Sequence, residues 1–437
     1  MKKFYLTSLG ALLALSALAQ DKTGFITTQE DLTVYNILFE NAPQNPNLKD
    51  VPRFTLVGKE GKFYLGMGAN LKMVGDFDWG APLSNPNLFV PSALEPAPAG
   101  NRSQTLFSIG QSNIYWNFVA LPGTSNQLGL FFDINFLGKT SHPVIAIHHA
   151  YLKYRGFTAG YIVSTFTDIK ADPVAIDFAG PNAITFIRHP NIYYTYKFGK
   201  DKMWSAQLGL DMPLAENSDF SSDNRIFKEG NAFTHSATTS FIHQRMPDIP
   251  LFIQRDWADH NGWFRVSAIF RDLQYRDNYI NNGSGRNEGE FGWGIKASGS
   301  TPICGGLSFT WQGVYGKGVA SYIQDLTGEG LDLVPVKDKP GKLETVKTWG
   351  AYGTLQYNFG KCALWNATYS HVRAYAPNFG GDWGGMYKFG QYATSNLIFN
   401  VSSFAQVGVE YLWGRRMNYD GTQVHDNRIM LMLNLSI

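Results

Sequence analysis

The strongest constraint on this chain is an alternation of apolar and polar side chains, which recurs in windows of about ten residues from Phe63 onward. Successive side chains of a β-strand point to opposite faces, so a period of two predicts strands with one apolar and one polar face. Sixteen such windows lie between Phe63 and Ile437, and the chain is predicted to be all-β. The last window shows the pattern most clearly in its apolar set: Ile429, Leu431, Leu433, Leu435 and Ile437.

The connections between these windows alternate in length. Turns after even-numbered windows are tight, as at Arg155-Gly156 and Gly199–Lys202, whereas those after odd-numbered windows are long, as at Asp78–Ser103 and Lys317–Lys347. Short turns at one end, long loops at the other and an even strand number are typical of outer-membrane barrels. We therefore predict a 16-stranded antiparallel transmembrane β-barrel over residues 62–437, which leaves no sheet edge unpaired in lipid.

The N-terminus has the features of a secretory signal. Lys2 and Lys3 precede the apolar run Phe4–Leu15, and the small residues Ala17-Leu18-Ala19 fit a cleavage site. We expect a signal peptide over residues 1–19 and a periplasmic lead-in over 20–61. The expected location is the outer membrane of a Gram-negative-type bacterium. No later apolar run approaches the roughly 18 residues that a membrane-spanning helix needs.

The charge balance argues against nucleic acid as a partner. Removal of Lys2 and Lys3 lowers the 37 basic residues to 35, which equals the 35 acidic residues. A barrel of about sixteen strands is too wide for side chains to fill, so it encloses an aqueous channel. Charged residues within the strands are expected to face this channel, because a cation at the bilayer midplane costs about 2–4 kcal/mol.

The predicted inner wall carries more basic than acidic side chains. A narrow charged channel favours ions of the opposite sign, so we predict a preference for small anionic solutes. Each basic residue could instead be a wall charge paired with a neighbouring carboxylate. The basic wall candidates are Lys72, Lys197, Arg265, Arg271, Lys296, Lys388, Arg416 and Arg428, and the acidic ones are Asp76, Asp133, Asp211 and Glu410.

The long connection Thr167–Pro190 differs from the neighbouring loops because it is rich in apolar residues. Long segments of this composition are more often functional than disordered, and we predict that this one folds inward and narrows the channel. It could instead pack on a neighbouring subunit or cap the outside. The polar residues expected at the constriction are Asp168, Lys170, Asp172, Asp177 and Arg188.

The same loop carries a family resemblance. The segment GFTAGYIVSTFTDIKADPVAIDFAGP, followed by Arg188, resembles the strand and constriction loop of the trimeric DcaP-like outer-membrane porins. The segments EYLWGRRMNYDG and NRIMLMLNL are similar to the last hairpin of that family, and the resemblance extends over most of Arg53–Ile437. It implies a homotrimer in contact with outer-membrane lipid and lipopolysaccharide, whose basic pore passes small anionic solutes such as dicarboxylates.

Sequence motifs give no support for an enzyme. Nucleophile-elbow, zinc-protease, P-loop and dinucleotide motifs are absent from any suitable context, so neither catalysis nor a cofactor is expected. His148 and His149 are neighbours in a predicted strand and should point to opposite faces, so no metal site is expected. We interpret Asp168, Asp172 and Asp177 as solvated loop charges rather than as a calcium site or an acid–base pair.

Cys304 and Cys362 are the only cysteines. They fall in turns at the short-turn rim on consecutive hairpins, and a disulfide would need Cα atoms within about 7 Å. A bridge and two free thiols are both open at this point. Two other functions also stay open. One is a barrel hydrolase, which would need Ser, His and a carboxylate on one wall, and the other is a secreted soluble β-rich binding protein.

Overall fold

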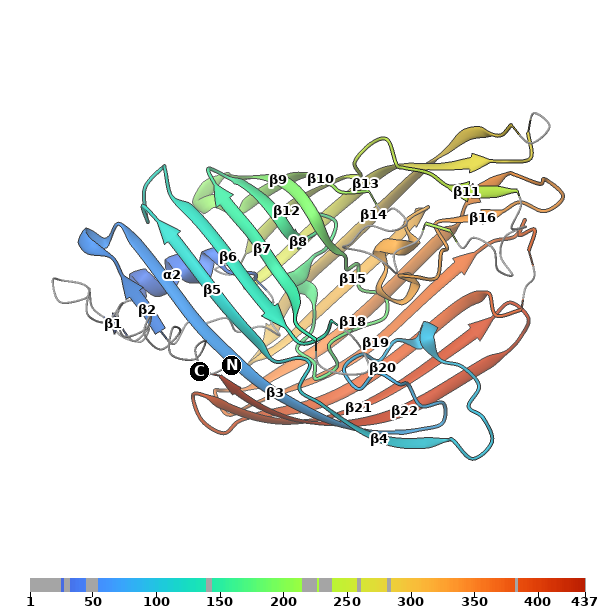
Figure 1. Ribbon diagram of the computed structural model, residues 1–437. Coiled ribbons are helices and arrows are strands. Elements are labelled where there is room, and N and C mark those ends of the chain that lie inside the picture. The colour runs from blue at the N-terminus through green and yellow to red at the C-terminus, as the bar shows by residue number, and fades with distance from the viewer. Residues whose placement is uncertain are drawn as a thin grey trace, which may run out of the picture.

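Sixteen antiparallel strands form a barrel in the computed structural model (Figure 1). The structure describes residues 25–26, 32–44, 54–138, 144–213, 226–227, 238–257, 261–280, 284–381 and 384–436, so the predicted signal peptide lies outside it. The wall strands are β3 (Phe63–Trp79), β5 (Asn113–Ala120), β6 (Leu128–Asn135), β7 (Ala146–Tyr154), β8 (Phe157–Val163), β9 (Arg188–Phe198), β10 (Trp204–Asp211), β12 (Ile249–Trp257), β13 (Gly262–Asp277), β14 (Arg286–Cys304), β15 (Leu307–Lys317), β18 (Lys347–Phe359), β19 (Ala363–Tyr375), β20 (Tyr387–Asn400), β21 (Ala405–Asn418) and β22 (Gln423–Ser436).

The barrel closes between its first and last strands. β22 pairs with β3 from Asn427 opposite Trp79 to Ser436 opposite Asn70. Two strands share the place beside β3 in the wall. β4 (Ser103–Ser108) pairs with the end of β3, and β5 pairs with its start. The sequence predicted one continuous strand here, and the interruption falls at residues 109–112.

The alternation sorts side chains between the two faces of the barrel wall. In β22, Leu431 is 60% exposed on the outside, whereas Met430 and Arg428 are fully buried on the inside. In β6, Leu130 is exposed and Asp133 is buried in the same way. An apolar outer surface around a polar interior is what a bilayer requires of a spanning barrel. The 16-stranded barrel predicted from the sequence is therefore confirmed.

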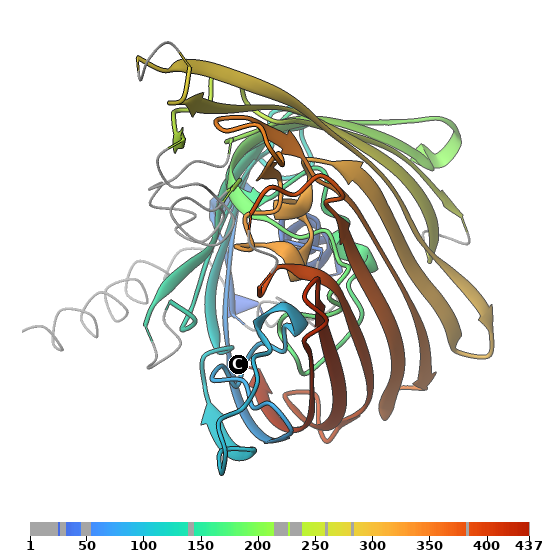
Figure 2. The same ribbon diagram turned by 90° about the vertical axis from the view of Figure 1, so that its right-hand side faces the viewer.

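Short turns and long loops lie at opposite ends of the barrel, on the left and right of Figure 1 respectively. Figure 2 looks in from the long-loop end and shows segments of chain crossing the interior. The loop after β15 contains a small two-stranded sheet of β16 (Leu333–Pro335) and β17 (Leu343–Thr345). The remaining elements are β1 (Phe25–Ile26), β2 (Phe54–Val57), β11 (Thr239–Phe241), η2 (Lys59–Gly61), η3 (Pro91–Ala93), η4 (Ile169–Ala171), η5 (Lys200–Lys202), η7 (Ala320–Tyr322) and η8 (Gln324–Leu326).

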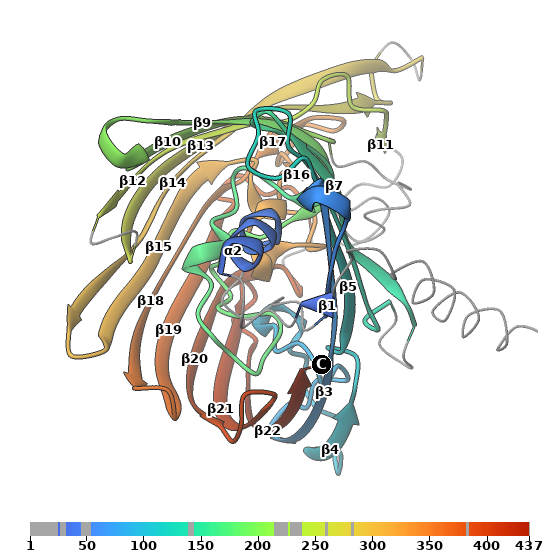
Figure 3. The same cartoon turned by 90° about the vertical axis from the view of Figure 1, so that its left-hand side faces the viewer.

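The single α-helix of the described residues, α2 (Leu32–Asn41), lies within the short-turn end of the barrel (Figure 3). Val34 and Leu38 are buried on the inward-facing Val119 of β5. The Asn117 amide donates to the Leu38 carbonyl at 2.6 Å, and the side chain of Asn41 donates to Asn117 at 2.7 Å. No helix among the described residues combines the length and apolar character needed to cross a membrane. The lead-in therefore places one helix inside the barrel mouth.

Candidate channel and constriction

The loop between β8 and β9, residues 164–187, lies against the inner wall of the barrel. Ile176 is fully buried in a cluster with Tyr392 of β20 and Leu412 of β21, which belong to the opposite side of the wall. Burial of this apolar surface holds the loop across the interior. The other large apolar loop residues that are buried are Phe166, Ile184 and Ile187.

Several wall side chains bind the main chain of this loop. The Tyr352 hydroxyl donates to the Ala171 carbonyl at 2.8 Å, and the Glu410 carboxylate accepts from the Ile176 amide at 2.7 Å. These bonds satisfy buried backbone groups that have no partner within a regular element. The side-chain amides of Gln312, Asn366 and Asn396 donate to further loop carbonyls.

Asp168 forms an ion pair with a predicted wall cation. Its Oδ1 lies 3.2 Å from Arg265 Nη1, and its Oδ2 accepts from Ser298 Oγ at 2.6 Å and from Trp263 Nε1 at 3.1 Å. Burial opposes ionisation of Asp168, but Arg265, Lys296 and these two donors outweigh it and hold the carboxyl pKa below its ordinary value. Asp168 therefore anchors the start of the loop.

Three other predicted cations are also buried and paired. Lys296 Nζ donates to the Phe166 carbonyl, within the loop. Arg271 Nε lies 2.9 Å from Asp248 Oδ2, and its Nη1 lies 2.9 Å from Asp332 Oδ2. Arg428 pairs with Asp76 and Asp78 in the same way. These three side chains are only 0–2% exposed, so they do not face open solvent. Each holds a loop to the wall, Arg428 through the Asn85 carbonyl.

Asp177 is a buried loop carboxyl without a cation in direct contact among the described residues. Its Oδ1 accepts from the Phe89 amide at 2.9 Å, and the Tyr392 hydroxyl donates to its Oδ2 at 3.1 Å. Burial, reinforced by the nearby Glu410 carboxylate, raises the pKa of Asp177 to about 7. The group therefore titrates in the neutral range.

Two cavities border the loop. One, of about 1090 Å³, reaches the short-turn rim and is bordered by both loop and wall residues. The other, of about 980 Å³, lies between α2 and strands β6 to β13 and also reaches the short-turn rim. Charged residues around the first cavity are Lys72, Asp172, Asp177, Arg188 and Lys361. Those around the second are Lys153, Arg155, Lys170, Lys197, Lys202 and Arg265, with Glu40, Asp201 and Asp256.

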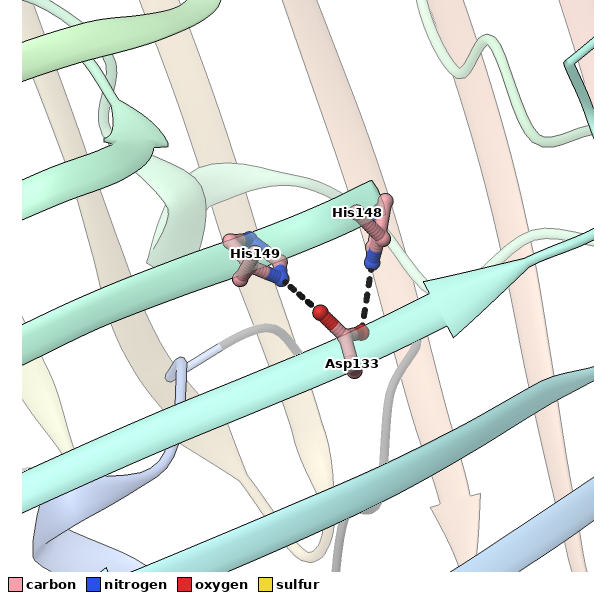
Figure 4. Close-up of side chains that lie close together, drawn as sticks. All are labelled: Asp133, His148 and His149. Carbon is pink, nitrogen blue, oxygen red and sulfur yellow. Dashed lines mark hydrogen bonds and ion pairs between the residues drawn. The ribbon is translucent and has the colours of Figure 1, made fainter. Parts of the chain in front are cut away.

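The prediction that His148 and His149 face opposite sides is wrong. A register shift in the β6–β7 ladder pairs Asp133 with His149 and Ile134 with Ile147, which leaves His148 as an extra residue. Such a bulge re-aims a side chain. Both imidazoles consequently point at one carboxylate, with His148 Nδ1 2.7 Å from Asp133 Oδ2 and His149 Nδ1 2.9 Å from Oδ1 (Figure 4).

Arg188 contacts one of these two histidines, His148. The β7–β8 ladder covers only Ala150–Tyr154 of β7, so the earlier residues of β7 lie beyond it. Arg188 Nη2, from the first residue of β9, lies 2.8 Å from His148 Nε2. Its guanidinium also lies over the Phe186 ring, 5.1 Å from the centroid. Arg188 thus ties the end of the loop to β7.

Cys304 and Cys362 are exposed free thiols. Cys304 ends β14 and Cys362 lies in the turn between β18 and β19, both at the short-turn rim. Of the two arrangements that the sequence left open, the structure contains the unbridged one.

Sequence reasoning missed a second inward loop, between β15 and β18. Tyr322, Ile323 and Leu326 are buried in the same cluster as Ile184 of the first loop. Asp325 lies there too, where it accepts from the Asn182 amide at 2.9 Å and from the Ser92 amide at 2.7 Å. The sequence could have indicated this second loop, because it is long and rich in apolar residues, as Thr167–Pro190 is.

Known structures share this architecture. The outer-membrane channel DcaP of Acinetobacter baumannii aligns with a TM-score of 0.68 and 17% identity, over 87% of this chain and 99% of that one. The anion-selective porin of Comamonas acidovorans aligns with a TM-score of 0.51 and 10% identity, over 86% and 100%. The outer-membrane protein OmpT of Vibrio cholerae gives 0.51 and 12%, over 87% and 99%.

Sequence comparison adds nothing to these structural matches. No family model and no curated protein matches the sequence. At identities of 10–17%, the structural matches establish the fold. The resemblance to DcaP-like porins drawn from the loop and the last hairpin is therefore supported at this level, and the chain has the closed-barrel fold of the outer-membrane porins.

Proposed function

We propose that this protein is an outer-membrane porin, a water-filled channel through which small anionic solutes such as dicarboxylates diffuse passively. The observation that carries the proposal is the charge of the cavity between α2 and strands β6 to β13. Besides Arg265, which is paired with Asp168, five basic side chains border this cavity against three acidic ones. Such an excess raises the local concentration of anions. The likeness in fold to an anion-selective porin agrees with this preference.

The loop of residues 164–187 is the proposed constriction. It crosses the interior, and its Asp172, Asp177 and neighbouring Arg188 border the cavity beside it. Lys72 from β3 and Lys361 at the rim border the same cavity, so with Arg188 they are the cations offered to a passing solute. Arg265, Arg271, Lys296 and Arg428 have a different role in this proposal, because their contacts hold loops in place.

We further propose that the barrel assembles as a homotrimer in contact with outer-membrane lipid and lipopolysaccharide. The exposed apolar residues of the outer face supply the surface that lipid or a neighbouring subunit would cover. Blue native electrophoresis of protein extracted in mild detergent tests the assembly. A single species at the mass of one chain would contradict it.

Planar-bilayer recording tests the channel. Purified protein should insert in ohmic conductance steps, and the reversal potential in a KCl gradient should show chloride preferred over potassium. Lys72→Met and Arg188→Ala should each reduce this preference. The matched control is Arg255→Ala, because Arg255 lies on the outer face over the Trp204 ring and should leave the reversal potential unchanged. Absence of conductance steps, or potassium preference in the wild type, would refute the proposal.

A further inference from the structure

The three groups around the bulge in β7 have the composition of a metal-binding site. Asp133, His148 and His149 are 0–2% exposed, and one ligand atom from each lies within 4.8 Å of the other two. Two imidazole nitrogens and a carboxylate oxygen form a common ligand set for a divalent transition-metal ion. A regular strand could not present both histidines to the same carboxylate, so the bulge is what creates the cluster.

We propose that Asp133, His148 and His149 bind a divalent transition-metal ion, with Zn²⁺ as the best fit, on the inner wall of the barrel. Bonds of about 2.0–2.2 Å in a tetrahedral site place ligand atoms roughly 3.3 Å apart. The two nitrogens lie 2.7 and 2.9 Å from the carboxylate oxygens, so a small separation of the side chains would admit the ion. His148 borders the interior cavity, which provides a route for the ion and for a water in the fourth position.

In the described part of the chain, hydrogen bonds satisfy both ring nitrogens of His148 but only one ring nitrogen of His149. Asp133, His148 and Arg188 form a complete chain, because each ring nitrogen of His148 has a partner. His149 repeats the contact with Asp133, yet its Nε2 is buried and has no hydrogen-bond partner among the described residues. His149 thus brings a second imidazole nitrogen to a carboxylate that His148 already contacts, which is the arrangement that a metal site needs and a hydrogen-bonded chain does not.

Metal binding and the Arg188 contact exclude each other. Arg188 can only donate, so His148 Nε2 must accept and the His148 proton lies on Nδ1, facing Asp133. A metal ion needs the lone pair of Nδ1, which moves that proton to Nε2. The Nε2–H would then face the guanidinium N–H at 2.8 Å, and both are donors. Arg188 must leave His148 when the ion binds, so the ion would change where this cation lies beside the cavity.

Calorimetry with ZnCl₂ and visible absorption with CoCl₂, both on the full-length folded barrel in detergent, test the site without reference to conductance. The wild type should bind one ion per chain, and Co²⁺ should give the intense absorption of a four-coordinate site. His149→Ala and Asp133→Asn should each weaken binding at least about 10-fold. His371→Ala is the matched control, because His371 lies on the outer face between Trp349 and Phe389.

Arg188→Gln gives a test that misfolding cannot imitate. Loss of the competing donor and its charge should tighten Zn²⁺ binding by about 10-fold. Absence of Zn²⁺ binding by the folded wild type, or wild-type affinity in both ligand variants, would overturn the site. Unchanged affinity in Arg188→Gln would overturn the competition with Arg188. Heat-modifiable migration on gels confirms that each variant is folded.

Discussion

Arg428 and Asp78 form a two-point ion pair that joins the last strand of the barrel to the first. Arg428 Nε lies 2.6 Å from Asp78 Oδ1, and Nη2 lies 2.8 Å from Oδ2. The two residues are direct cross-strand partners in the β22–β3 ladder, and both side chains are fully buried. Arg428 also donates to the Asn85 carbonyl at 3.0 Å, so the pair fixes the loop after β3 to the seam.

Arg428→Ala should destabilise the barrel by about 3–5 kcal/mol, because it leaves buried Asp78 without its cation. Denaturant-induced unfolding from lipid vesicles, followed by tryptophan fluorescence, measures the change. Arg286→Ala is the control, since its partner Glu288 lies in an exposed pair that should contribute less than about 1 kcal/mol. Equal effects of the two substitutions would contradict a special role for the seam.

Asp177 should make the stability of the protein depend on pH. Its pKa is raised from 3.8 to about 7 in the folded protein, so the folded state binds the proton more tightly than the unfolded state. The stabilisation that protonated Asp177 gives to the folded state is complete below about pH 4. It is lost as the pH rises to about 7, at up to about 1.4 kcal/mol per pH unit. Asp177→Asn should remove that slope, as measured by thermal unfolding in detergent at pH 5, 6, 7 and 8.

The matched control for this titration is Asp201→Asn, in the exposed turn η5. It should retain the wild-type fall in stability between pH 5 and 7. A slope that is the same in the wild type and in Asp177→Asn would show that another group is responsible.

Helix α2 should limit the conductance of the channel. Leu38 is fully buried against the wall, so Leu38→Asp should detach the helix and increase single-channel conductance. Phe39→Asp is a close control, because Phe39 is the next residue of the same helix but is 43% exposed. Bilayer recordings at fixed KCl concentration provide the measurement. Identical conductance in Leu38→Asp and the wild type would mean that the helix does not obstruct the current.

Cys304 and Cys362 should both react with a thiol reagent in the folded protein. Each is exposed and free at the short-turn rim. Maleimide labelling without reductant, read by intact-mass spectrometry, should add two labels per chain, and Cys304→Ser should add one. A wild-type protein that takes up no label until it is reduced would demonstrate a disulfide.

The barrel could be predicted because lipid imposes a strict rule on each strand. Residues such as Leu431 and Arg428 must lie on opposite faces, so the alternation identifies both the strands and their orientation. The apolar character of Ile176 and Ile184 likewise indicated that their loop is ordered, and both are buried inside the barrel. These inferences depend only on local sequence.

The partners of the wall cations could not be predicted in the same way. Arg271 pairs with Asp332 across 61 residues, and that contact depends on how the second inward loop folds. The bulge at His148 depends on the register of two strands, which an alternating pattern leaves unspecified. The position of α2 depends on its contacts with Val119 and Asn117 of β5, which the sequence of the helix by itself does not identify.

The wall binds the loop of residues 164–187 partly through main-chain atoms, and this has a consequence for protein engineering. Tyr352 and Glu410 contact a carbonyl and an amide that any non-proline residue would supply. Lys170, whose side chain borders the cavity beside α2, is therefore open to replacement while these anchors are kept. The barrel can serve as a fixed frame in which the charge and width of the opening are varied by design.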